Sequence, residues 1–345
     1  MDYRRMGNTG LKVSELCFGT MTFGSGTDQA SADKMVGEAL DAGINFFDTA
    51  NSYGGGQSEV MLGKAIPGDR DRLVIATKFF NPMGSGVNDS GMSRLHIMQA
   101  LEASLKRLGT DYVDLYYIHH VDRQTPLEEM LRTLDDLVRQ GKVRYTGCSN
   151  YQGWRLMKAL WLSDQHNWAR FDCFQPQYNL VVRDIEQELI PICQTEGLGV
   201  VVWSPLGGGF LSGKYQPGQR VLSGTRSADD WAFPQDYFAV NADETLKAVM
   251  EVANESGRSP AQIALRWCLA QPAITAAIVG ARTLDQFVDN LKAGSFQLEG
   301  DPLERLNRVS HLPDRYPESM EKNMHQRRDE AVSMPSASGL LDRAP

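Results

Sequence analysis

Four side chains of types that move protons each lie at or just beyond the end of an apolar, strand-like run: Asp48, Tyr53, Lys78 and His119. A carbonyl group that is reduced by hydride gains negative charge on its oxygen and needs a proton, which a tyrosine can donate. The hydride must come from a bound cofactor, because no side chain supplies one. These four residues are therefore a candidate site for the reduction of a carbonyl group.

Each residue type has a definable part in that chemistry. The unperturbed pKa of a tyrosine is about 10, and a nearby ammonium group lowers it because the positive charge favours the phenolate. We expect Tyr53 to be the acid, Lys78 to tune it, Asp48 to fix Lys78, and His119 to hydrogen-bond the carbonyl oxygen. Taken singly, each also has an ordinary structural interpretation, such as a turn cap for Asp48 or packing for Tyr53.

Other catalytic chemistries find less support in the sequence. A metal centre would need several histidines and carboxylates at one place, but His119 and His120 are adjacent and should point to opposite sides of a strand. The other four histidines lie on expected helices or in the tail: His96, His166, His311 and His325. A serine hydrolase is disfavoured because no G-x-S-x-G motif is present. We expect no metal site.

The stretch from Gly208 to Lys214 fits the first seven positions of the phosphate-binding loop G-x-x-x-x-G-K-[ST]. The eighth position is Tyr215, where a compact hydroxyl for magnesium is required. Pro217 and Gly218 follow at once, so no helix is expected. The sequence favours a phosphate-contacting loop over a triphosphatase.

The elements that would position these residues alternate regularly along the chain. Eight strand-like runs, each followed by a helix-like segment, lie at 15–20, 44–50, 73–79, 112–120, 143–150, 171–179, 199–206 and 274–281. This pattern predicts a parallel sheet closed into a single (β/α)8 TIM barrel, with chemistry at the carboxyl ends of the strands. An N-terminal hairpin is expected around Gly7, and an open doubly wound sheet is the alternative. We expect the barrel to span 1–312 and a partly disordered extension to span 313–345.

Composition narrows the class of partner. The chain has 345 residues, a net charge of −8 and no block of basic residues, which disfavours nucleic acid and anionic membranes as partners. The start of the chain lacks a signal-peptide pattern, and no apolar run reaches the roughly 20 residues of a membrane span. Five scattered cysteines without a C-x-x-C pair indicate reduced thiols in a cytoplasmic protein. The sequence leaves a homo-oligomer open.

From about residue 4 to 294 the sequence resembles the aldo-keto reductase family, and especially its bacterial and potassium-channel-β-subunit-like branches. The resemblance is carried by "FFDTANSYGGGQSE", "IATKF", "DLYYIHHVD", "GCSNY", "QPQYN", "VVWSPLGGGFLSGKY" and "IVGARTLDQFVDNLKA". It implies a barrel that binds NADPH or NADP+ in an extended pose, and it assigns Asp48, Tyr53, Lys78 and His119 the same four parts.

The resemblance also implies the cofactor contacts. The nicotinamide carboxamide should meet Ser149, Asn150 and Gln175, and its ring should stack on Trp203. The pyrophosphate should meet Ser204, Leu206, Gly208 and Lys214, and the adenosine end Gly280, Arg282, Gln286 and Asn290. Further cofactor contacts are expected from Gly19, Thr20, Met21, Asp48 and Pro205.

Arg282 carries the expected preference for NADPH, because it precedes Thr283 at the start of a helix whose N-terminus favours a phosphate. Besides Tyr53 and His119, we expect Phe23, Phe80 and Trp231 to line the substrate pocket, although each is equally compatible with plain packing. The substrate would be an aldehyde or a ketone. A regulatory subunit that binds the cofactor with little turnover is the alternative function.

Overall fold

The computed structural model describes residues 1–66, 68–219, 241–317, 319–321, 324 and 326–327. The chain divides into two compact units, Met1–Ser310 and His311–Pro345. The second unit contains helical backbone at 319–321. The expected boundary between a barrel over 1–312 and a partly disordered extension over 313–345 stays a prediction.

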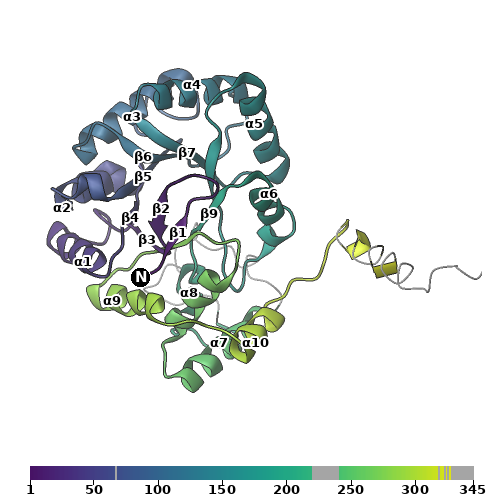
Figure 1. Cartoon of the computed structure of the whole chain (residues 1–345). Helices are drawn as coiled ribbons and strands as arrows, with labels where there is room; N and C mark the ends of the chain where they lie inside the picture. Colours follow the sequence, from purple (N-terminus) through teal and green to yellow (C-terminus); the bar gives the residue numbers. More distant parts are fainter. Residues whose placement is uncertain (67, 220–240, 318, 322–323, 325, 328–345) are drawn as a thin grey trace, which may run out of the picture. The chain divides into compact units, whose positions relative to one another are not determined.

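The first unit is built on a closed barrel of eight strands, which run in the order β10-β3-β4-β5-β6-β7-β8-β9 and pair in parallel. The strands are β3 (Leu16–Gly19), β4 (Phe46–Asp48), β5 (Val74–Phe79), β6 (Val113–Ile118), β7 (Val143–Ser149), β8 (Phe171–Gln175), β9 (Gly199–Val202) and β10 (Ala276–Val279). Helices surround them in Figure 1. The prediction of a (β/α)8 barrel with an N-terminal hairpin is confirmed.

The helices of the first unit are α1 (Gln29–Asp41), α2 (Gln57–Ala65), α3 (Arg94–Leu108), α4 (Leu127–Arg139), α5 (Gly153–His166), α6 (Leu189–Glu196), α7 (Ala242–Ser256), α8 (Pro260–Ala270), α9 (Leu284–Leu291) and α10 (Asp301–Val309). Short 3-10 helices are η1 (Tyr53–Gly56), η2 (Arg70–Arg72), η3 (Asp184–Glu186), η4 (Gly207–Ser212) and η7 (Lys292–Ser295). Ser93 and Thr283 cap α3 and α9, and the side chain of each accepts a main-chain N–H. The sequence pattern favours Ser31 at the start of α1, but Asp28 is the cap and accepts from the Ser31 N–H.

The barrel interior is filled by one compact cluster, because alternate side chains of each strand point inward. Its buried members are Met6, Val13, Cys17, Phe46, Val74, Ala76, Leu115, Tyr117, Cys173, Val201 and Ala276. Met6 directly follows β1 (Tyr3–Arg5), and Val13 lies within β2 (Lys12–Ser14). These two strands form a hairpin that lies across the barrel in Figure 1. The hairpin thus closes the amino-terminal end, and the carboxyl ends of the strands are left for polar side chains.

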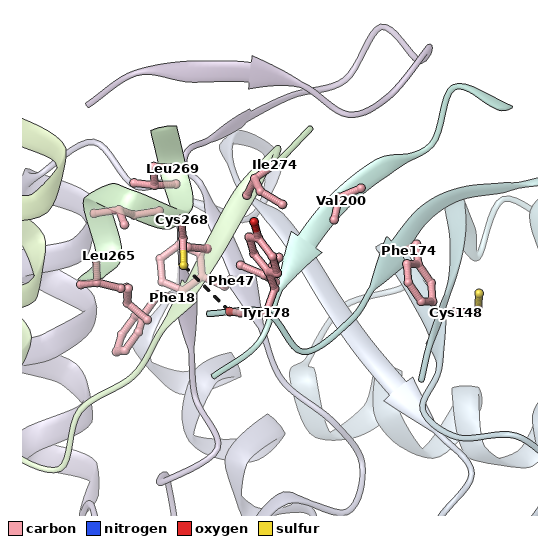
Figure 2. Close-up of a cluster of buried hydrophobic side chains, with 14 of the residues drawn as sticks. Phe18, Phe47, Cys148, Phe174, Tyr178, Val200, Leu265, Cys268, Leu269 and Ile274 are labelled. Carbon is pink, nitrogen blue, oxygen red and sulfur yellow. Dashed lines mark hydrogen bonds between the residues drawn. The ribbon is translucent and has the colours of Figure 1, made fainter. Parts of the chain in front are cut away.

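Helix α8 was not expected from the sequence. Nearly all of its residues are buried, from Ala261 to Leu269, so it lacks the polar face that marks an amphipathic helix. Trp267 stacks on Tyr178 with ring centroids 5.2 Å apart. Figure 2 shows Cys268 of this helix among the apolar side chains of the barrel wall, with its Sγ 3.9 Å from the main-chain oxygen of Tyr178. The helix therefore seals the layer between the strands and solvent.

Among the described residues, no helix combines the length and the apolar character that a membrane span requires.

Candidate active site

Three of the four proton-carrying residues meet at the carboxyl end of the barrel. Asp48 ends β4, Lys78 lies in β5, and Tyr53 opens η1 just after β4. The Lys78 Nζ donates to Oδ1 of Asp48, to the main-chain oxygen of Thr49 at 2.8 Å, and to the Tyr53 hydroxyl at 3.3 Å. An ammonium group has three N–H donors, so these three acceptors satisfy all of them.

The electrostatics of Lys78 are set by two opposing effects. Its side chain is fully buried and that of Asp48 is 3% exposed. Burial alone would lower the pKa of Lys78, but the Asp48 charge and the Tyr53 contact outweigh it, so the pKa is raised. Lys78 is therefore a permanent cation beside the Tyr53 phenol, which is the arrangement that favours proton release from a tyrosine.

His119 lies against Tyr53, with ring centroids 5.7 Å apart and the rings nearly perpendicular. Burial, with the Lys78 and His120 charges, lowers the pKa of His119 to about 2. The ring is therefore neutral at physiological pH. Its buried Nδ1 has no hydrogen-bond partner in the described part of the chain.

The expectation that His119 and His120 point to opposite sides is wrong. Their rings stack with centroids 4.6 Å apart and an interplanar angle of 9°. The reason is that β6 ends at Ile118, so the strict alternation of a strand no longer applies to the next two residues. The described residues nevertheless contain no group of three or more side chains that could hold a metal ion.

The turn that carries Tyr53 is positioned by a partly buried ion pair that sequence reasoning missed. Gly56, with φ 95°, leaves no room for a side chain, because a Cβ would lie 2.9 Å from Cδ of Arg107. Arg107 donates from Nε to Glu59 at 2.6 Å, and Thr77 donates to the same carboxylate at 2.5 Å. Glu59 is fully buried. It thus ties the turn and α2 to β5, the strand that holds the lysine.

The residues assigned to the nicotinamide carboxamide already bind protein groups. Ser149 donates from Oγ to the main-chain oxygen of Gln175 at 2.6 Å. The Asn150 amide donates to the His119 main-chain oxygen at 3.1 Å and accepts from the Trp203 indole N–H at 3.2 Å. These bonds hold the indole of Trp203 at the mouth of the barrel, half-buried. The indole ring of Trp203, beside the exposed Asn150, could support a planar ring such as a nicotinamide.

The end of β3 is tied to the site by hydroxyl groups. The Thr20 hydroxyl lies 3.2 Å from the Asp48 main-chain oxygen, and the Ser58 hydroxyl lies 2.8 Å from that of Thr20. Gly19 must lack a side chain, because a Cβ would lie 2.5 Å from Cγ2 of Ile278. Met21 is half-buried.

The glycine-rich loop after β9 folds on itself. The N–H of Gly208 donates to the Ser204 hydroxyl at 2.9 Å. Pro205 is buried, Leu206 is half-buried and Lys214 is exposed. Tyr215 is 2% exposed and packs beside Phe210. A buried phenol cannot serve as the magnesium ligand of a triphosphatase loop, which supports the sequence-based interpretation.

A second cation lies after β10, at the start of α9. Arg282 and Gly280 are exposed, Gln286 is half-buried and Asn290 is buried. The Arg282 N–H donates to the Gln286 side chain at 3.3 Å, so the first turn of the helix is closed.

The nearby carboxylate of Asp289 accepts from Ser259 at 2.6 Å and from Gln262 at 2.7 Å. Those bonds hold it within the protein. Lys214 and Arg282 are both exposed, and exposed cations of this kind can contact phosphate groups.

The residues expected in the substrate pocket lie in different surroundings. Phe80 is half-buried and meets His120 edge to face at 5.5 Å. Phe23 is fully buried and packs against Phe18 with centroids 5.7 Å apart, which favours the packing interpretation. Trp231 lies outside the described residues.

Comparison with known proteins agrees with this geometry. The model of the Aldo/keto reductase family matches residues 15–311. The chain is 41% identical over 320 residues, or 90% of its length and 96% of the relative, to "Uncharacterized oxidoreductase YrpG" of Bacillus subtilis. It is 36% identical over 301 residues, 85% of this chain and 91% of the relative, to "Probable voltage-gated potassium channel subunit beta" of Oryza sativa. It is 32% identical over 338 residues, 89% of this chain and 96% of the relative, to "Versiconal hemiacetal acetate reductase" of Aspergillus parasiticus. The chain belongs to the aldo/keto reductase family.

Proposed function

We propose that the protein reduces an aldehyde or a ketone to an alcohol with NADPH, reversibly, and that Tyr53 is the proton donor. The observation that carries this proposal is the bonding of Lys78 to both Asp48 and Tyr53 at the carboxyl end of the barrel. A buried cation beside a phenol has little structural value of its own, because burial of charge costs free energy. It has a clear use where a tyrosine must release a proton.

A nicotinamide cofactor, when bound, would supply the hydride that the carbonyl carbon accepts in the proposed reaction. The Tyr53 hydroxyl gives its proton to the carbonyl oxygen, and Lys78 stabilises the phenolate that remains. His119, neutral because burial lowers its pKa to about 2, hydrogen-bonds the same oxygen. A neutral imidazole has one N–H, and a buried N–H without a partner is costlier than a buried acceptor. With Nδ1 buried and unpartnered among the described residues, the proton is better carried on Nε2.

The cofactor is proposed to be NADPH because Arg282 is exposed at the beginning of α9 and Lys214 at the end of the glycine-rich loop. An arginine at a helix N-terminus favours the additional phosphate of NADPH over NADH. Trp203, held by Asn150, would support the nicotinamide ring. We also propose a cytoplasmic location, since all five cysteines are buried thiols.

The test is NADPH oxidation with a panel of aldehydes and ketones, for the wild type and for Tyr53→Phe. The variant should lose at least about 100-fold in kcat, because a positioned acid contributes factors of that order. Its Kd for NADPH should stay unchanged. Wild-type turnover in Tyr53→Phe would refute the assignment of the acid.

The likeness to the rice protein named as a channel subunit favours a second candidate, a regulatory subunit that binds the cofactor with little turnover. Tight NADPH binding together with only trace rates on every carbonyl compound would support that candidate. Rapid reduction of any member of the panel would support the enzyme.

A further inference from the structure

Gln175 bonds directly to the central carboxylate of the site. Its Nε2 donates to Oδ2 of Asp48 at 2.8 Å, while Oδ1 of Asp48 accepts from Lys78. The two residues lie on β8 and β4, 127 positions apart in sequence, and each is 2% exposed. Both oxygens of the carboxylate are therefore engaged, one by a cation and one by an amide.

This contact fixes which way the Gln175 amide faces. An ionised carboxylate only accepts hydrogen bonds, whereas an amide side chain has a donor end and an acceptor end. The donor end must therefore face Asp48, which turns Oε1 away from it. The main chain at this point is held too, because Ser149 donates to the Gln175 main-chain oxygen at 2.6 Å.

We propose that Gln175 is a positioning residue for the Asp48–Lys78 pair: it holds Oδ2 of Asp48 so that Oδ1 stays on Lys78, and it acts on Tyr53 only through them. This inference rests on the proposed function. It gives Gln175 a part distinct from cofactor binding, for which its Oε1 and the second N–H of Nε2 remain. Without the amide, the carboxylate could rotate about its Cβ–Cγ bond and Lys78 would lose its fixed place beside Tyr53.

Two variants separate the donor from the acceptor. Gln175→Glu keeps an oxygen in the Oε1 position but replaces the donor by a second carboxylate. Gln175→Met removes donor and acceptor at similar volume. The matched control is Asn150→Asp, which makes the same amide-to-carboxylate change at the barrel mouth on a residue that binds His119 and Trp203 and not Asp48.

The pH dependence distinguishes these variants because two adjacent carboxylates share a proton when the pH falls. In Gln175→Glu, the introduced carboxyl group can donate to Asp48 once it is protonated, and the pair then carries the single negative charge of the wild type. We expect kcat of Gln175→Glu to be about tenfold or more below wild type at pH 8, as for a lost hydrogen bond to a charged group. The ratio of wild-type kcat to Gln175→Glu kcat should shrink toward pH 5, whereas the same ratio for Gln175→Met and for Asn150→Asp should stay constant.

Most of the surrounding groups keep one protonation state across that pH window, and His120 is common to the wild type and all the variants. The pKa of Lys78 is raised, so it stays charged, and the pKa of His119 is about 2, so it stays neutral. Burial lowers the pKa of His120, with a contribution from the Lys78 charge. Burial also raises the pKa of the other titratable groups near Asp48, which therefore stay protonated: Cys17, Tyr117 and Cys173.

A second readout needs no turnover. The apoprotein of Gln175→Glu is labelled with 13C at the glutamate carboxyl carbons and titrated by NMR. The signal that the wild type lacks belongs to the introduced side chain. Its pKa should lie well above the ordinary range of a glutamate. Parallel deficits of Gln175→Glu and Gln175→Met at all pH values, or ordinary titration of the introduced carboxyl group, would overturn the proposal. A wild type without any carbonyl reduction would instead refute the proposed function, and the titration would then decide the inference alone.

Discussion

Replacing Asp48 by Asn should destabilise the protein in a pH-dependent manner, because it leaves the Lys78 ammonium buried without a counter-charge. The Lys78 side chain is fully buried, so solvent cannot screen the charge. Removing one partner of a buried pair costs about 3–5 kcal/mol. Lys78 keeps its bonds to Thr49 and Tyr53, and Asn still offers an acceptor, so we expect the lower end, about 3 kcal/mol at pH 7.

The sign of the pH dependence follows from the Lys78 pKa. In the wild type this pKa is raised, so the stabilisation is fully present below the unfolded pKa and is lost only as the pH rises through the folded one. In Asp48→Asn the effect of burial is no longer offset by Asp48, and the folded pKa should fall below the unfolded one. The unfolded chain then binds more protons, so the variant's free energy of unfolding should rise with pH, by at most about 1.4 kcal/mol per unit.

The assay is urea unfolding of both apoproteins between pH 6 and 10, followed by circular dichroism. The destabilisation should be greatest at pH 6 and shrink toward pH 10. Glu102→Gln, which breaks the partly exposed pair with Lys142, is the control and should cost less than about 1 kcal/mol at every pH. A loss for Asp48→Asn that is below about 1 kcal/mol, or independent of pH, would refute the reasoning about the buried pair.

Three further predictions concern single side chains. Arg282→Ala should raise the Kd for NADPH about tenfold and leave that for NADH unchanged, by calorimetry, because one charge-assisted phosphate contact is lost. His119→Gln should flatten the fall in unfolding free energy below about pH 6.5, because the folded pKa of His119 is about 2 and only the unfolded chain binds a proton there; a slope equal to that of the wild type would contradict this. Phe23→Ala should cost about 3–5 kcal/mol in urea unfolding without reordering the preferred carbonyl substrates, because Phe23 is fully buried. Altered substrate preference would place it in the pocket.

Much of the barrel could be predicted because its signals are local. Each strand is an apolar run followed by a helix, and the polar residue at its end identifies the carboxyl face. Helix α8 was not predicted because it is buried on all sides, so its sequence lacks the alternation of apolar and polar residues that marks an amphipathic helix. Ser259 and Pro260 nevertheless mark its start. Within the first unit, α10 was likewise not expected, although Pro302 stands in its first turn.

The site could be predicted as a set of residue types but not as a set of bonds. Asp48, Lys78 and Tyr53 were expected to meet, and the hydrogen bonds bring them together. The Gln175 bond to Asp48 joins residues 127 positions apart, and no local pattern encodes it. Likewise, His119 stacks on His120 because β6 ends at Ile118. The alternation of residue types in the sequence does not determine where that strand ends.

The loop from Gly208 to Lys214 shows how the same sequence pattern can serve a different structure. In a triphosphatase loop, free main-chain N–H groups converge on the phosphates. Here Gly208 donates to the Ser204 hydroxyl and Gly209 to the Leu206 main-chain oxygen, so these N–H groups are used within the turn. The glycines supply positive φ angles, 65° at Gly208 and 99° at Gly209, which the turn requires. The loop therefore resembles the triphosphatase motif in sequence but differs from it in hydrogen bonding, because at least these two N–H groups are not available to a phosphate.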